Sequence, residues 1–142
     1  MANKYRCQKK GSVLKDYSRR APRNINQYEW GKITENRARE IINLLFERSL
    51  IKEFRHASRK EDEKLRTDFL VILNSGKMVG IQVKSSPEGV IDFFLKEIYN
   101  PIIRSYPVIA FIPNIKKQKN SEEADRLWKK IKQFENLSYI KH

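Results

Sequence analysis

Apolar residues first fall into a regular pattern between residues 31 and 50, in the stretch GKITENRAREIINLLFERSL. At about 100° per residue they form one broad stripe, which predicts an amphipathic helix. The stripe consists of Ala38, Ile41, Ile42, Leu45 and Phe46. Either Thr34 is the N-cap, or the helix continues a turn that begins at Trp30. Glu35 lies at the edge of the stripe near the start of the helix, so this acid is expected to look inward.

Three strands are expected in the middle of the chain. Residues 51–57 (IKEFRHA) predict a first strand with poor alternation, and residues 58–66 (SRKEDEKLR) predict a charged, exposed loop. Residues 67–73 (TDFLVIL) and 77–85 (KMVGIQVKS) are rich in β-branched residues, and the turn-forming Asn74-Ser75-Gly76 separates them. These two strands are therefore expected to form an antiparallel hairpin.

The last part of the chain predicts a helix, a strand and a second helix. Residues 88–100 have a helical pattern limited by Pro101, and the apolar run 106–113 (YPVIAFIP) is typical of a strand buried on both faces. Residues 121–137 predict a helix capped by Ser121. Its stripe, which serves the core or a dimer contact, contains Leu127, Ile131 and Phe134. The element order indicates an α/β fold with a mixed β-sheet flanked by helices on both sides.

Composition narrows the class of partner. Of 142 residues, 30 are Lys or Arg and 17 are Asp or Glu, which gives a formal net charge of +13. Such a charge attracts polyanions, so we expect a nucleic acid partner, with an anionic membrane surface as the weaker alternative. Residues 1–27 lack a sustained apolar period and are expected to form a basic N-terminal arm, either gripping phosphates or solvated. Residues 28–142 fit one domain.

The same composition bears on compartment and on metal chemistry. The chain has one cysteine and no apolar run near the roughly 20 residues of a membrane helix. Its basic N-terminus is not followed by an apolar signal segment, so we expect a cytoplasmic protein without a membrane anchor. A Cys/His zinc site is excluded because only His56 and His142 accompany Cys7. His56 is expected to be structural or solvated.

The remaining candidates for catalysis are carboxylates and lysines, and the most promising ones lie in the expected hairpin. Asp68 begins the first hairpin strand, and Gln82 and Lys84 end the second. In an antiparallel hairpin these ends lie side by side. A connection of two or four residues would point Asp68 away from Gln82 and Lys84, whereas three or five residues would put all three on one face. A shared site therefore requires an odd-length connection or a bulge.

Glu35, Asp68 and Gln82-Val83-Lys84, in that order on helix, strand and strand, resemble the PD-(D/E)XK nuclease superfamily. The pattern is most similar to archaeal-type Holliday junction resolvases and restriction-endonuclease-like proteins. The resemblance covers roughly residues 31–113 and includes the apolar run 106–113 after the second expected helix. It implies a restriction-endonuclease-like fold and a metal-dependent endonuclease, a hydrolase that cuts DNA phosphodiester bonds in recombination or repair.

The resemblance also implies roles for individual residues. Asp68, the side-chain oxygen of Gln82 and the backbone carbonyl of Val83 would bind Mg²⁺ or Mn²⁺, and Glu35 would add a carboxylate directly or through water. Lys84 would orient the attacking water and stabilise developing charge. Two serines, Ser85 and Ser86, would hydrogen-bond a phosphate. Cutting a branched junction needs two symmetric nicks, so a homodimer is expected.

Two positions depart from the family pattern. Thr67 stands where the family has proline, and Gln82 stands where it usually has an acid. An amide keeps the oxygen ligand but removes one negative charge, so Glu35 would carry more of the charge balance. The residues expected to contact DNA besides the two serines are Arg37, Arg39, Arg55, Arg66, Arg19, Arg20 and Arg23.

Two further readings of the residues stay open. The chain either keeps the nuclease fold as a non-catalytic nucleic-acid-binding protein, or serves as a subunit of a nucleoprotein complex. For Asp68 and Lys84 the plain alternative is an acid and a lysine on a solvated strand end.

Overall fold

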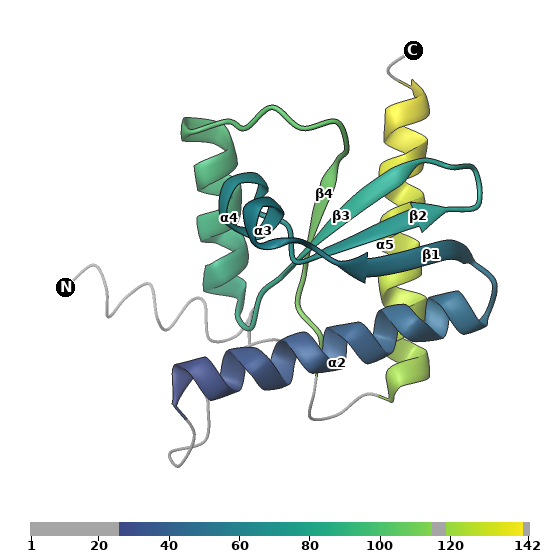
Figure 1. Cartoon of the computed structure of the whole chain (residues 1–142), viewed down its shortest axis with the longest axis horizontal. Coiled ribbons are helices and arrows are strands. Elements are labelled where there is room, and N and C mark those ends of the chain that lie inside the picture. Colours follow the sequence, from purple (N-terminus) through teal and green to yellow (C-terminus); the bar gives the residue numbers. More distant parts are fainter. Residues whose placement is uncertain (1–25, 115–118, 141–142) are drawn as a thin grey trace, which may run out of the picture.

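The computed structural model describes residues 26–114 and 119–140, which contain four helices and four strands (Figure 1). The elements in chain order are α2 (Gln27–Glu47), β1 (Ile51–His56), α3 (Arg59–Leu65), β2 (Phe69–Leu73), β3 (Met78–Val83), α4 (Pro87–Tyr99), β4 (Val108–Phe111) and α5 (Asn120–Ile140). The strands form one sheet in the order β1-β2-β3-β4. The first three strands are antiparallel, and β4 runs parallel to β3. The protein therefore has an α/β fold with a mixed sheet, as expected.

Helix α2 begins four residues before the expected start. Asn26 is its N-cap, and the side-chain Oδ1 of Asn26 accepts a hydrogen bond from the backbone N–H of Glu29 at 2.8 Å. The alternative in which Thr34 caps the helix is wrong. Thr34 is buried within the helix, and its hydroxyl donates to the Trp30 carbonyl at 2.9 Å. The extra turn buries Trp30, a gain that the apolar stripe of residues 38–46 did not indicate.

The stretch 58–66 is largely a short helix, so the prediction of a loop is wrong. Ser58 and Glu61 form a reciprocal capping box: the Glu61 N–H donates to Ser58 Oγ, and the Ser58 N–H donates to Glu61 Oε1. This S-x-x-E spacing is a helix-start signal. The helix was not predicted from apolar periodicity, because α3 buries none of its residues and so has no apolar stripe. Arg66 ends the helix in a left-handed conformation, with φ of 51°.

The remaining boundaries differ less. The first strand is confirmed at Ile51–His56, and the hairpin strands are each two residues shorter at the end where Thr67 and Ser85 lie. β4 alternates instead of being buried on both faces. Ser121 lies inside α5, after Asn120, and is not its cap.

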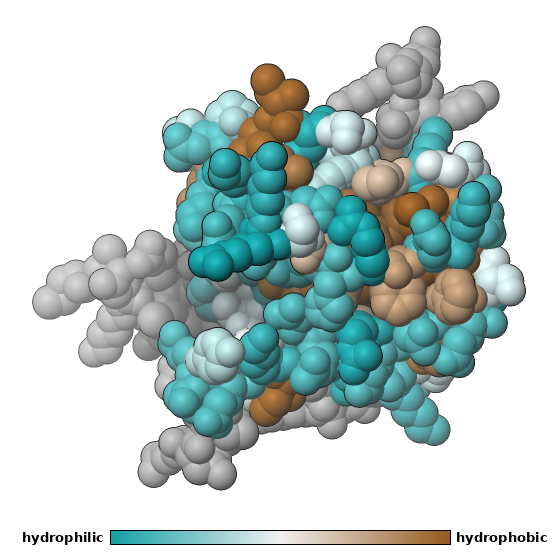
Figure 2. Space-filling model, viewed as in Figure 1, coloured by the Kyte–Doolittle hydropathy of each residue, from teal (hydrophilic) through white to brown (hydrophobic). Residues whose placement is uncertain are grey.

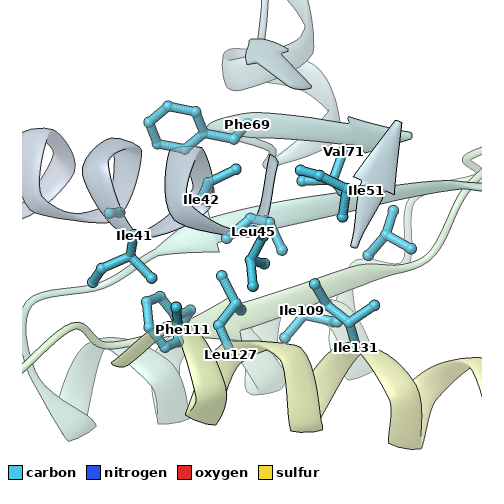
Figure 3. Packing of buried hydrophobic residues seen from close by; sticks show 14 of the residues in the cluster. Ile41, Ile42, Leu45, Ile51, Phe69, Val71, Ile109, Phe111, Leu127 and Ile131 are labelled. Atoms are coloured by element: carbon cyan, nitrogen blue, oxygen red, sulfur yellow. The ribbon is translucent and has the colours of Figure 1, made fainter. Parts of the chain in front are cut away.

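One face of the sheet carries the main core. α2 and α5 cross each other on this face (Figure 1), and their apolar side chains meet those of β2 and β4 (Figure 3). The fully buried members include Ile41, Ile42, Leu45, Phe69, Val71, Phe111, Leu127 and Ile131. Phe134 packs against this cluster. The stripe on α5 therefore belongs to the core, which resolves the alternative of a dimer contact.

α4 lies against the other face of β4. Ala110 alternates with the core residues Ile109 and Phe111, and it lines a hollow together with Pro87 and Val90 of α4. Helices consequently cover both sides of the sheet. None of the helices in the described part of the chain is long and apolar enough to cross a bilayer.

Gly80 lets the centre of the hairpin pack closely against its neighbours. A Cβ at this position would lie 2.9 Å from Cγ2 of Val108 and 3.1 Å from Cγ2 of Thr67. Thr67 is fully buried and shares a hydrogen bond with the Tyr106 hydroxyl at 3.2 Å, so it has little room to move. This contact fixes the segment that leads into Asp68.

We expect Gly80→Ala to lower the free energy of unfolding by about 1–3 kcal/mol, because the added methyl group overpacks a rigid site. Gly31→Ala in α2 is the matched control. There an added Cβ meets no atom within 4 Å, so the substitution should stabilise the helix by about 0.5–1 kcal/mol. Urea unfolding of the two variants measures both values, and equal effects would contradict this account of Gly80.

Candidate functional site

A cleft of about 370 Å³ opens where the first half of α2 faces the carboxyl end of β3. It is lined by Tyr28, Gly31, Lys32, Thr34, Glu35, Asp68, Gln82, Val83, Lys84 and Ser85. The structure thus brings together all four residues expected to be catalytic, although they come from one helix, one strand and the approach to another. Val83 and Ser85 line the same cleft.

The hairpin register places Asp68 beside Gln82. The Leu73 N–H donates to the Lys77 carbonyl at 2.8 Å and closes the hairpin, so the turn itself has three residues, Asn74-Ser75-Gly76. The Gly76 φ of 92° allows it to turn. Phe69 then pairs with Ile81 and Leu70 with Gly80. The paired register ends there, and Asp68 and Gln82 line the same cleft. The connection has an odd number of residues, as a shared site requires.

The backbone ladder breaks at Asp68, and its side chain takes over. The Asp68 N–H donates to the Ile81 carbonyl at 2.9 Å instead of pairing with Gln82. One carboxylate oxygen, Oδ2, accepts the Val83 N–H at 2.7 Å. This bond holds the carboxylate at the end of β3.

The carboxyl group of Asp68 is in an environment that disfavours its charge. Burial raises the pKa of Asp68 to about 7, against the opposing effect of the Val83 N–H. The nearby acids Asp62 and Glu35 raise this pKa further. A strongly raised pKa in a cleft marks a functional-site candidate. Asp62 was missed by sequence reasoning, because only the capping box of α3 indicates the helix that brings it near.

Gln82 has an unused acceptor at the same place. Its side-chain Oε1 is buried and has no hydrogen-bond partner in the structure. A buried acceptor without a partner is unfavourable by about 1–3 kcal/mol, unless a cation or water satisfies it. Amide, carboxylate and carbonyl oxygens are the ligands that Mg²⁺ prefers. The donor set of Gln82, Asp68 and the Val83 backbone therefore fits a hard divalent cation.

The acids alone do not make such a site. Within residues 26–114 and 119–140, no three His, Cys, Asp or Glu side chains are arranged to hold a metal ion. The Gln82 amide oxygen is therefore a necessary part of the donor set. Glu35, whose side chain is about one-third exposed, would reach the site by rotation or through a water.

His56 adds a group that sequence reasoning set aside. Its Nδ1 lies 3.7 Å from Glu35 Oε1, and its ring packs on Phe69 with centroids 4.5 Å apart. His56 is the last residue of β1 and pairs with Phe69, the first residue of β2. Its position in the sequence could have indicated this, because the end of one antiparallel strand lies beside the start of the next, and Asp68 lies at the start of β2.

The residues after β3 are fixed by the start of α4. The stem of Lys84 lies over Gly89, where a Cβ would come within 3.3 Å of Lys84 Cδ. Ser86 caps α4, and its Oγ accepts the Gly89 N–H at 3.2 Å. Ser85 faces the cleft, whereas Ser86 is not among the residues that line it.

None of the expected DNA-contacting arginines within the described part of the chain lines the cleft. Arg37 and Arg39 are on α2. The guanidinium of Arg55 binds Glu61, and that of Arg66 binds Glu97 at 2.5 Å. Arg19, Arg20 and Arg23 fall outside the described residues. At the mouth of the cleft the structure instead places Lys32, whose Nζ lies 5.7 Å from the centre of the Tyr28 ring.

Comparison of the chain with protein-family models, with curated proteins and with solved structures gives no match. The geometry of the cleft and the chemistry of its residues are therefore the basis for assigning a function.

We expect Asp68→Asn to stabilise the protein in the presence of a chelator. The pKa of Asp68 is raised from 3.8 to about 7 in the folded state, so stability present below about pH 4 is lost as pH rises through 7. Asn keeps an acceptor for the Val83 N–H without the charge. At pH 8 the gain should be a few kcal/mol and should shrink towards pH 4.

Chemical unfolding at several pH values measures this difference. Asp125→Asn, on the exposed side of α5, is the control, and its effect should stay within about 0.5 kcal/mol at every pH. A destabilised Asp68→Asn protein at pH 8 would contradict the assigned environment.

Proposed function

We propose that the protein is a metal-dependent endonuclease with a restriction-endonuclease-like fold, which hydrolyses phosphodiester bonds of DNA. One observation carries the proposal: a single cleft gathers Glu35, Asp68, Gln82 and Lys84, and it contains a buried oxygen without a partner. The spacing and element context of these residues resemble the PD-(D/E)XK nucleases. The odd-length hairpin connection that such a site requires is present.

Asp68, Gln82 and the Val83 carbonyl would hold Mg²⁺ or Mn²⁺, with Glu35 contributing directly or through water. When bound, the cation would lower the pKa of a coordinated water and offset charge on the phosphate. The negative charges of Asp68, Asp62 and Glu35 favour a cation at this position. Gln82 contributes an oxygen that adds no further repulsion among them.

Lys84 supplies a positive charge of the protein itself at the end of β3, beside Gln82. Anchored over Gly89, its ammonium group would orient the attacking water and stabilise charge that develops on the phosphate oxygens. Ser85, which also lines the cleft, would donate a hydrogen bond to a phosphate oxygen. Glu35 lines the cleft and lies 3.7 Å from His56 Nδ1, so this acid–imidazole pair would help to hold a water near the site.

The surface around the cleft suits a nucleic acid. Lys32 at its mouth would contact a phosphate next to the one cleaved, and the exposed ring of Tyr28 offers a face for base stacking. The net charge of +13 favours association with DNA by counterion release. Among DNA substrates, branched junctions of the Holliday type are the first to test.

Incubation with linear, branched and single-stranded DNA, with Mg²⁺, Mn²⁺ or a chelator, tests the proposal. We expect cleavage with either cation and none with chelator. Lys84→Ala should slow cleavage by about 10² to 10⁴-fold without loss of fold, because the group that positions the attacking water and stabilises the developing charge is lost. The control is Lys77→Ala, at the exposed turn of the hairpin.

Two results would overturn parts of the proposal. Binding of DNA without cleavage of any substrate would favour a non-catalytic protein that keeps the nuclease fold, or a subunit of a nucleoprotein complex. Full cleavage by Lys84→Ala would remove Lys84 from the site and leave the nuclease activity standing.

Gln82→Glu should strengthen cation binding several-fold, since it restores a second carboxylate opposite Asp68. The increase in melting temperature on adding Mn²⁺ should be larger in this variant than in the parent protein, in line with mass action. Gln133→Glu, on the exposed side of α5, controls for the added charge. A smaller Mn²⁺ effect in Gln82→Glu would contradict the placement of the cation.

A further inference from the structure

α4 presents an apolar stripe to the outside of the molecule. Its members are Ile91, Phe94, Leu95, Ile98 and Tyr99, which are 43–77% exposed. They recur at the i, i+3, i+4, i+7, i+8 spacing of one helix face. Phe93, 2% exposed, points the opposite way, into the protein. The stripe is thus a second apolar face of α4, separate from the face that packs on the sheet.

A further apolar residue is exposed beyond the end of the helix. Ile103, in the segment that follows α4, is 97% exposed. Figure 2 shows hydrophobic residues at the upper edge, over the segment that follows α4, and a second group at the right, over β1 and β2. With roughly 150–250 Å² for a large side chain, the six exposed fractions amount to on the order of 700 Å². A standard stable interface buries about 800 Å² per partner.

The charged residues beside the stripe indicate what kind of partner it can bind. Glu88 and Asp92 lie along one flank with Lys96, whose Nζ is 3.2 Å from Asp92. Two acids and one base do not suit a polyanion, so neither DNA nor an anionic membrane fits this face. The basic residues 1–25 lack an apolar period that could cover it. A partner with its own apolar helix and mixed charges is required, and α4 itself meets that description.

We propose that two copies of this chain form a dimer in which the stripes of their α4 helices pack together, antiparallel, about a two-fold axis near Phe94. A two-fold contact requires a self-complementary surface. In this arrangement the charged flank of one α4 lies beside the same flank of the other α4, and the two helices run in opposite directions. Asp92 of each copy therefore lies opposite Lys96 of the other. Ile91 of each copy likewise meets the far end of the partner stripe.

The proposal stands on the surface of α4 and does not depend on phosphodiester cleavage. It has a geometric consequence for the cleft, because Lys84 and the Ser86 cap lie at the amino end of α4. In an antiparallel pair the two amino ends are about one helix length apart, roughly 20 Å for 13 residues. The two clefts would then be related by the same two-fold axis.

Sedimentation of the full chain over a range of concentrations tests the dimer. The parent protein should sediment as a dimer, and Phe94→Glu or Ile98→Glu should raise the dimer dissociation constant by at least about 100-fold. Phe46→Glu, on α2, is the matched control, since Phe46 is 45% exposed and Phe94 is 53% exposed. Circular dichroism checks that each variant is folded. A monomeric parent protein would overturn the proposal.

A cross-linking experiment tests the position of the axis. In a Cys7→Ser background, Phe94→Cys should be joined to its copy by a short bis-maleimide, because residues near a two-fold axis meet themselves. Phe46→Cys should not cross-link. A dimer that persists in both glutamate variants, or that cross-links at position 46 and not at 94, would place the interface elsewhere and overturn the role of α4. Loss of cleavage with an intact dimer would instead count against the proposed function alone.

Discussion

A three-residue turn between β2 and β3 sets the register on which the candidate site depends. Because side chains alternate along a strand, a slip of one residue would move Asp68 to the other side of the sheet from Gln82. Packing around Gly80 resists such a slip, since Thr67 and Val108 close on the glycine from both sides. The end of β3 is then tied to Asp68 by the bond from the Val83 N–H, so one turn and one bond together define the floor of the cleft.

The cleft concentrates groups that do not stabilise one another. Asp68 is buried near Asp62 and Glu35, and Gln82 buries an acceptor without a partner. The core between α2, α5 and the sheet supplies the stability that tolerates this arrangement. Sites of this kind are common where binding a ligand later satisfies the strained groups. The local instability is therefore an argument about function, whereas the core alone would support many functions.

Much of the fold could be predicted because it rests on apolar periodicity, as in α2, the hairpin and α5. α3 could not be predicted that way, since it buries no residue and depends on the Ser58–Glu61 capping box. The sequence could state what the convergence of Asp68 with Gln82 requires, an odd-length connection or a bulge, but could not choose the register. His56 and Asp62 were missed because their places depend on how β1 pairs with β2 and on the direction in which α3 leaves the sheet. Neither feature is encoded in a local pattern.

The hydroxyl of Ser86, which caps α4, affects two parts of the protein. It holds the first turn of α4, and that turn both supports the stem of Lys84 through Gly89 and begins the helix that carries the outer apolar stripe. A substitution that frays this turn would disturb the cleft and the outward face together. The cleft and the outward face therefore depend on the same first turn of α4, and a loss of order there would affect both.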